Sequence, residues 1–148
     1  MKIRVAEIED LEKWIDLVKR EQEYFPGLEI KEYESIVKKF IQNKEAICVE
    51  KDKKIIGSLL FSKKEKELCF LVVDKNYRKQ HLGKKMIEMM LENFESNDRI
   101  KVSTYREEDE KGKNTRLFYK KLGFTEGELS IEFNYPVQVF YLLNKNKE

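Results

Sequence analysis

The sequence has little of several residue types that mark specialised classes of protein. Its 148 residues include only two cysteines, two prolines and a single histidine. Cys48 and Cys69 lack the spacing of metal ligands, and each lies in an apolar, strand-like run, so we interpret both as small core residues. A disulfide-stapled fold and a metal centre are therefore not predicted.

Long hydrophobic runs and an excess of one charge are also missing. No apolar stretch approaches the roughly 18 residues that a membrane span needs, and residues 1–5 do not begin a signal peptide. We therefore expect a cytoplasmic protein with no membrane partner. The 30 basic and 28 acidic side chains leave a net charge of +2. Because nucleic-acid-binding domains usually carry a large basic excess, a nucleic-acid partner is not expected.

What the sequence does contain is typical of a globular protein. Hydrophobic residues make up 41% and charged residues 39% of the chain, and the apolar ones recur at regular spacings. We predict a single domain over residues 1–148, with enough apolar side chains for a core of its own.

The spacing of the apolar residues predicts helices and strands in a definite order. A strand at residues 3–6 precedes two amphipathic helices, whose connecting loop centres on residues 25–28. Three strands of an antiparallel meander follow, and the last of them, residues 68–73, is apolar without alternation, which indicates burial on both faces. A helix, a strand and a short helix ending at Gly123 come next. Two final strands are expected at residues 124–133 and 137–143, joined by a turn at 134–136.

This order predicts an α/β fold. We expect a mixed, mostly antiparallel sheet of six to seven strands, flanked by helices on both faces. The C-terminal strands would leave an exposed sheet edge, which is compatible with a homodimer.

The junction between the central strand and the next helix is the strongest candidate for a binding site. The strand ends at Val73, and a polar, basic turn leads into a helix that begins near Lys84. The first N–H groups of a helix have no partner within it, and the helix dipole adds partial positive charge there. We therefore expect a phosphorylated part of a ligand to bind at residues 79–84.

Two stretches together resemble one family, the GNAT N-acetyltransferases. Residues 77–83 read YRKQHLG, which is similar to the family's acyl-CoA loop, Arg/Gln-x-x-Gly-x-Gly/Ala. Residues 118–124 read FYKKLGF, which is similar to its second signature, Phe/Leu-Tyr-x-x-x-Gly-Phe. Both occur in the family's order, and the predicted elements fit its fold over essentially the whole chain. The resemblance implies a GNAT-like acyl-CoA N-acyltransferase fold with acetyl-CoA as cosubstrate.

By this resemblance, coenzyme A lies along the central strand and across the basic turn. The strand would lend backbone groups to the pantetheine arm, and Arg78 and Lys84 would add charge near the pyrophosphate. The turn departs from the family at His81, which replaces the first glycine; its amide stays available, but its Cβ restricts the turn. The residues expected to bind the cofactor are Leu71, Val72, Val73, Arg78, Lys79, Gln80, His81, Leu82, Gly83, Lys84 and Asn114.

The same resemblance assigns catalysis to Tyr119. In the family, an amine attacks the acetyl carbonyl directly, and a tyrosine at this position protonates the leaving thiolate. A tyrosine that only packs its ring is the alternative. A second departure is Gly112, where the family often has asparagine. Asn114 could replace that asparagine or could cap the following helix, and we favour the cap.

The general base remains open. Glu67, Glu107 and Glu108 are candidates, because the attacking amine must lose a proton. His81 is disfavoured as a base, since it lies at the phosphate end.

The amine acceptor is open as well. Tyr105 could line its pocket. Tyr24 and Phe25 lie near the loop of the first helical pair, where the family builds its acceptor site, but core packing explains them equally well.

We predict an N-acetyltransferase that moves an acetyl group from acetyl-CoA to a primary amine of a small molecule or peptide. The alternative is a non-catalytic sensor or regulatory domain that binds acyl-CoA without turnover. The histidine at position 81 and the lack of an evident base leave this alternative open.

Overall fold

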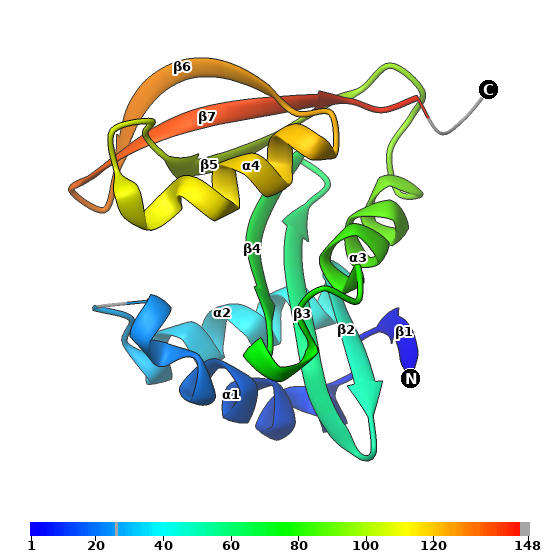
Figure 1. Cartoon of the computed structure of the whole chain (residues 1–148). Coiled ribbons are helices and arrows are strands. Elements are labelled where there is room, and N and C mark those ends of the chain that lie inside the picture. The colour runs from blue at the N-terminus through cyan, green and yellow to red at the C-terminus, as the bar shows by residue number, and fades with distance from the viewer. Residues whose placement is uncertain (26, 146–148) are drawn as a thin grey trace.

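The computed structural model describes residues 1–25 and 27–145, which form a seven-stranded sheet with helices on both faces (Figure 1). The predicted α/β fold class is confirmed, and the strand order is β1-β2-β3-β4-β5-β7-β6. The strands are β1 (Lys2–Val5), β2 (Ala46–Lys51), β3 (Lys54–Ser62), β4 (Glu67–Val73), β5 (Arg99–Tyr105), β6 (Thr125–Glu132) and β7 (Tyr135–Leu143). The helices are α1 (Leu11–Arg20), α2 (Ile30–Gln42), α3 (Leu82–Leu91) and α4 (Lys113–Lys121). Short 3-10 turns are η1 (Ile8–Asp10), η2 (Gln22–Tyr24), η3 (Lys75–Tyr77) and η4 (Glu110–Gly112).

The sheet is divided at its centre. Neighbouring strands pair antiparallel except β4 and β5, which run parallel and pair only at Glu67 with Lys101 and Leu68 with Val102. Past Leu68 the two strands diverge, as Figure 1 shows. We call β1–β4 the N-terminal arm and β5, β7 and β6 the C-terminal arm.

Each face of the sheet has its own apolar core. Trp14 of α1 and Val37 of α2 are fully buried on one face, against Cys48 and neighbouring residues of the N-terminal arm. On the other face, α3 buries its apolar stripe, and Phe140 of β7 continues this core into the C-terminal arm. The stripe consists of Met86, Ile87, Met90 and Leu91, as the helical spacing predicts. Burial of each such side chain is worth about 1.5–3 kcal/mol.

Gly57 allows α3 to lie close to the sheet. A Cβ atom at this position would come within 3.0 Å of Met86 Cε and 3.1 Å of Val49 Cγ2. The register of β2 and β3 also shifts beside it, between Val49 and Glu50. Both a bulge and a close approach therefore explain this glycine.

Two expectations from the sequence are wrong. Strand β4 is not buried along its whole length, because its residue Cys69 is exposed. Of the two cysteines predicted to lie in the core, only Cys48 is buried. Cys69 falls at a register shift against β3 and just past the last pair with β5, so both neighbouring strands leave it uncovered. The last turn lies at Phe133 and Asn134, with φ of 50° and 64°, so β7 begins at Tyr135.

The two edge strands of the sheet are β1 and β6. Strand β6 exposes Leu129 and Ile131, and the homodimer stays a prediction. No helix in the described part of the chain is long and apolar enough to cross a membrane.

Candidate functional site

The gap between the arms leaves one edge of β4 without a partner strand. The N–H of Asp74 donates to the carbonyl of Ile56 on β3, at 2.8 Å. Backbone groups of successive residues in a strand point to opposite edges, so those of Leu71 and Val73 face the gap and those of Val72 face β3. The pairing with β5 has ended at Leu68. Arg78 Nε donates to the Val73 carbonyl at 3.3 Å, which leaves both backbone groups of Leu71 and the Val73 N–H facing the gap.

The turn from β4 into α3 closes one end of this edge. His81 is the N-cap residue of α3 and adopts the left-handed conformation, with φ 61° and ψ 25°, and its side chain makes no capping hydrogen bond. The His81 side chain thus does not cap the first N–H groups of the helix, at Leu82, Gly83 and Lys84, and no other side chain in the described part of the chain does so. Lys79 and Lys84 are exposed beside them. Such a turn favours an anion.

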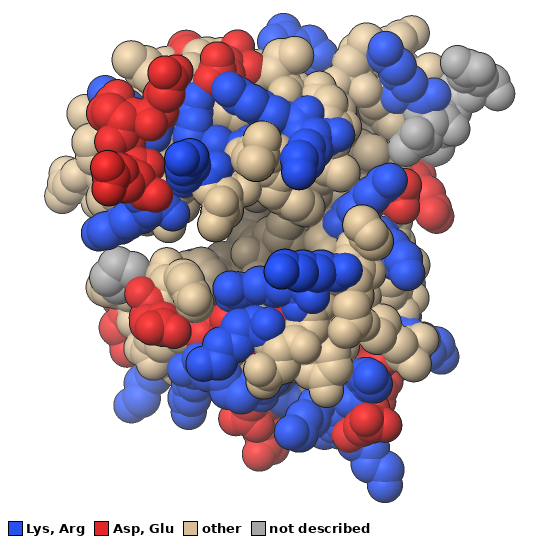
Figure 2. Space-filling view, viewed as in Figure 1, with Lys and Arg blue, Asp and Glu red and all other residues tan. Residues whose placement is uncertain are grey.

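A hollow separates the two arms on the face shown in Figure 2. Lys and Arg side chains gather on both of its rims, over α4 on one side and over the turn after β4 on the other (Figures 1 and 2). Acidic side chains gather instead toward one end of the C-terminal arm. The electrostatic potential in the hollow therefore favours a negatively charged ligand.

Tyr119 lies on the helix that covers the C-terminal arm. It comes from α4, which packs against β5, and its side chain is 6% exposed. Its ring centroid lies 5.2 Å from those of Phe118 and Phe124. Within residues 1–25 and 27–145, no hydrogen bond of its hydroxyl is seen. Burial raises the pKa of Tyr119 above its ordinary value, so the phenol keeps its proton at neutral pH.

A comparison with protein families now decides the identity. The family model for the acetyltransferase (GNAT) domain matches residues 42–126, which extend from the end of α2 into the start of β6. This chain belongs to the GNAT family of acetyltransferases.

Solved structures share the GNAT fold at low sequence identity. A GNAT-family acetyltransferase from Bacillus cereus ATCC 10987 is 17% identical over 97% of this chain and 96% of its own, with a TM-score of 0.76. The ribosomal-protein-S18-alanine N-acetyltransferase from Escherichia coli is 15% identical over 99% and 96%, with a TM-score of 0.71. An aminoglycoside 6'-N-acetyltransferase complexed with coenzyme A is 14% identical over 100% and 99%, also with a TM-score of 0.71. No curated protein matches the chain.

In this GNAT protein, the predicted cofactor residues fall into two groups. Leu71 and Val73 face the gap, whereas the backbone of Val72 is directed to β3, which argues against its predicted role. Of the turn, Lys79, Gln80, His81 and Lys84 are exposed, and Leu82 and Gly83 are buried.

Packing against α4 also explains why a glycine stands at position 83. A Cβ atom there would lie 3.0 Å from Phe118 Cζ of α4, so the glycine lets the start of α3 approach α4.

Arg78 does not point freely toward the turn. Its Nη2 lies 2.6 Å from Glu21 Oε1, and its guanidinium stacks 4.9 Å from the ring centroid of Tyr24. Glu21 is only 1% exposed. The charge that the sequence assigns to the phosphates is thus already paired with a buried carboxylate.

Asn114 does not cap α4, so that expectation is wrong. The N-cap residue is Gly112, and Asn114 is exposed within the first turn of the helix. Gly112 packs on Tyr105, where a Cβ atom would come within 2.1 Å of Tyr105 Cβ. This contact explains why no asparagine stands at position 112. A contact between Asn114 and the cofactor stays a prediction.

The three candidate bases differ in their surroundings. Glu107 and Glu108 are exposed in the loop after β5. Glu67 is half-buried at the closed end of the gap, paired in register with Lys101. Burial raises the pKa of Glu67, and the charge of Lys101 partly opposes this. A raised pKa makes the ionised carboxylate a better proton acceptor.

Sequence reasoning missed Arg116, because arginine is normally a surface residue. It is 5% exposed, and its Nη1 donates to the Tyr105 carbonyl at 2.7 Å and to Gln138 Oε1 at 2.8 Å. It also pairs with Glu126. Arg116 thus joins α4 to β5, β6 and β7. Its position three residues before Tyr119, on the same helical face, was the available signal.

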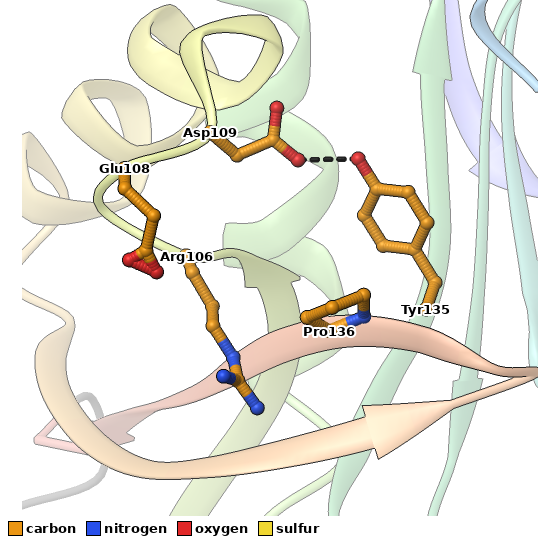
Figure 3. Close-up of a pocket in the computed structure, with 5 residues that line it drawn as sticks. All are labelled: Arg106, Glu108, Asp109, Tyr135 and Pro136. Atoms are coloured by element: carbon orange, nitrogen blue, oxygen red, sulfur yellow. Dashed lines mark hydrogen bonds between the residues drawn. The ribbon is translucent and has the colours of Figure 1, made fainter.

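A shallow pocket lies at the end of the C-terminal arm (Figure 3). The Tyr135 hydroxyl donates to Asp109 in this pocket, and Arg106 donates to the carbonyls of Val137 and Ser130, at 3.1 and 2.8 Å. These bonds hold the loop after β5 against the β6–β7 hairpin. The pocket is lined by Arg106, Glu108, Asp109, Tyr135 and Pro136.

The aromatic residues of the first helical pair have separate roles. Phe25 packs on Phe70 of β4, with ring centroids 4.9 Å apart. Tyr33 is buried and its hydroxyl accepts a hydrogen bond from Trp14 Nε1 at 2.9 Å. Tyr24 is 47% exposed.

Proposed function

We propose that this protein is an acyl-CoA-dependent N-acetyltransferase, with residues 1–148 acting as one catalytic domain. It transfers the acetyl group of acetyl-CoA to a primary amine of a small molecule or peptide. The observation that carries the proposal is the gap between β4 and β5. It combines an unpaired strand edge with an uncapped basic turn. Tyr119 is expected beside it, because its neighbour Phe118 on α4 lies against Gly83 at the start of α3.

These features suit the parts of acetyl-CoA in order. The pantetheine arm contains amides, which can pair with the backbone of Leu71 and Val73 as an added strand does. The pyrophosphate can bind the N–H groups at the start of α3, with Lys79 and Lys84 beside them. In support, one structural neighbour was solved with coenzyme A.

The proposed chemistry is direct transfer. The amine nitrogen attacks the acetyl carbonyl carbon, so that a C–N bond forms and the C–S bond breaks. Tyr119 gives its proton to the leaving thiolate, and a backbone N–H on the gap edge of β4 would stabilise the developing oxyanion. The amine proton passes to a base, for which Glu67 is the best-supported candidate. Transfer of a proton from the base back to the Tyr119 phenolate completes the cycle.

Cys69 does not compete as a nucleophile. Partial burial, followed by the charge of Glu67, raises the pKa of the Cys69 thiol to about 12. At neutral pH the sulfur therefore stays protonated and reacts poorly. This supports direct transfer over an acetyl-cysteine intermediate.

Substitution of Tyr119 by phenylalanine tests the mechanism. Tyr119→Phe keeps the ring packing and should lower kcat by about 100-fold or more, because general acid catalysis is lost. The affinity for acetyl-CoA should stay unchanged. Coenzyme A release over a panel of amines measures the rate, and calorimetry measures the binding.

The control is Tyr141→Phe, which removes a hydroxyl that donates to Glu128 on the surface and keeps the ring. Because the raised pKa keeps Tyr119 protonated, wild-type activity should not decline below about pH 10. Unchanged turnover in Tyr119→Phe would rule out its role as the acid. Binding of acetyl-CoA without release by any amine would favour the sensor alternative.

A further inference from the structure

An ion pair connects two segments that lie on different faces of the sheet. Glu21 follows the last residue of α1, and Arg78 belongs to the turn that leads into α3. A carboxylate at a helix C-terminus meets the negative end of the dipole, and Glu21 is only 1% exposed. It therefore requires a cationic partner, and Arg78 supplies one at 2.6 Å.

A second ion pair repeats this connection one residue earlier. Arg20 Nη2 lies 3.1 Å from Asp74 Oδ2, and Asp74 is buried. Asp74 also accepts a hydrogen bond from the Asn76 N–H at 2.9 Å. The end of α1 and the turn after β4 are thus held together at two points.

Arg78 extends the connection to the segment after α1. Its guanidinium stacks on Tyr24, and its Nε donates to the Val73 carbonyl on the gap edge of β4. The next residue, Phe25, packs on Phe70 of β4. Residues 22–25 therefore form a wall beside the gap, on the face opposite α3. We call Glu21, Tyr24 and Arg78 the clasp.

The two sides of the clasp suit different substrates. The turn with its uncapped N–H groups leads into α3, so it takes the phosphates of acetyl-CoA in the proposed function. The α1–α2 face remains for the amine, which must reach the acetyl group from the other side. Arg78 has two of its three nitrogens engaged away from the phosphate site.

We propose that Arg78 is a positioning residue, which holds residues 22–25 in the conformation that receives the amine. It sets the affinity for the amine rather than for the phosphates of acetyl-CoA. The effect on the affinity for the amine rests on the proposed function, whereas the effect on the conformation of residues 22–25 does not.

The test compares Arg78→Gln with Glu21→Gln. Both variants break the same ion pair, so both should raise KM for the amine by about fivefold or more. Glu21 lies outside the phosphate turn, so its substitution removes no group that could bind the phosphates. Both should leave the calorimetric Kd for acetyl-CoA within about twofold of the wild-type value. Lys79→Gln, in the same turn, should do the reverse and weaken acetyl-CoA binding.

The contrary hypothesis, that Arg78 binds the phosphates, predicts that the two variants change the affinity for acetyl-CoA in opposite directions. If Arg78 binds the phosphates, Arg78→Gln weakens acetyl-CoA binding, whereas Glu21→Gln frees the guanidinium and strengthens it. That pair of results would overturn the proposal, as would an unchanged KM for the amine in both variants. The double variant should be no worse than either single one, because the two residues act as one unit.

Hydrogen exchange of the unliganded protein gives a readout that needs no activity. Both variants should speed exchange at the amides of Tyr24, Phe25 and Leu28, whose bonds to the carbonyls of Glu21, Gln22 and Phe25 form this segment. Unchanged exchange there would refute the clasp. If the wild-type protein neither binds acetyl-CoA nor releases coenzyme A, the proposed function fails, and the exchange rates still decide the clasp.

Discussion

Glu67 carries an ionisable group in a place that disfavours its charge. Burial raises its pKa above the ordinary value. A raised carboxyl pKa stabilises the fold fully below the unfolded-state value of about 4.3, and this stabilisation is lost as the pH rises through the folded-state value. The ionised Glu67 side chain at neutral pH therefore lowers the free energy of unfolding.

Glu67→Gln should separate stability from activity. At pH 7 the variant should unfold at a higher temperature than the wild type, and near about pH 4 the difference should vanish, since the wild-type carboxyl is then protonated. If Glu67 is the base, kcat falls by about 100-fold or more. Thermal melts at both pH values and amine kinetics measure the two effects. Equal melting shifts at both pH values would contradict a raised pKa at Glu67.

His81 holds a backbone conformation that a glycine adopts freely. With φ at 61° it pays a steric penalty, although histidine tolerates this region better than most residues. His81→Gly should leave the free energy of unfolding within about 1 kcal/mol, because relief of strain offsets greater freedom in the unfolded chain.

His81→Val is the matched contrast. A β-branched residue disfavours positive φ most strongly, so we expect a loss of about 1–2 kcal/mol and weaker acetyl-CoA binding. Urea unfolding and calorimetry measure both quantities. A valine variant that equals the glycine variant would show that the turn does not depend on this conformation.

Contacts between elements are tightest where α4 begins. Gly112 lies directly on Tyr105, at the end of β5. Gly112→Ala should destabilise the protein by about 1–3 kcal/mol, since the added Cβ overlaps an atom that cannot move without the strand. Gly83→Ala is the control, because the atom closest to its Cβ is at the far end of the Phe118 ring, 3.0 Å away. Denaturant unfolding compares the two, and an equal effect would contradict this ranking.

The order of the elements was predictable from the sequence because each buries one regular stripe. The apolar face of α3 is an example, since its helical spacing alone identifies Met86 and Met90 as core. The exposure of Cys69 was not predictable, because it depends on where β5 leaves β4. The turn at Phe133 was misplaced, because Pro136 is the stronger local turn signal, and yet it lies inside β7.

The candidate site was predictable from the sequence only where a local motif defines it. The basic turn and Tyr119 follow from local motifs. The partner of Arg78 does not, because Glu21 lies far away in the sequence and is one of 28 acidic residues. The same holds for Arg116, whose burial depends on four elements that meet around it.

For the protein as a whole, the two arms are held together at the sheet by only two residue pairs. A ligand that fills the gap should therefore stabilise both arms at once. At about 100 times its Kd, acetyl-CoA should add about 2.7 kcal/mol to the free energy of unfolding. Hydrogen exchange should slow at Leu71 and Val73 on the edge of β4.

Adenosine diphosphate is the matched control ligand, because it has a pyrophosphate but no pantetheine arm. It should protect the start of α3 and leave the β4 edge unprotected. Equal protection by both ligands would argue against pantetheine in the gap.

The same unpaired edge of β4 has a consequence for turnover. In the proposed function, coenzyme A keeps its pantetheine arm and pyrophosphate after the acetyl group has left. The spent product then binds with nearly all the contacts of the substrate, and it occupies the gap until it dissociates. The enzyme would thus respond to the ratio of acetyl-CoA to free coenzyme A, rather than to the acetyl-CoA concentration alone.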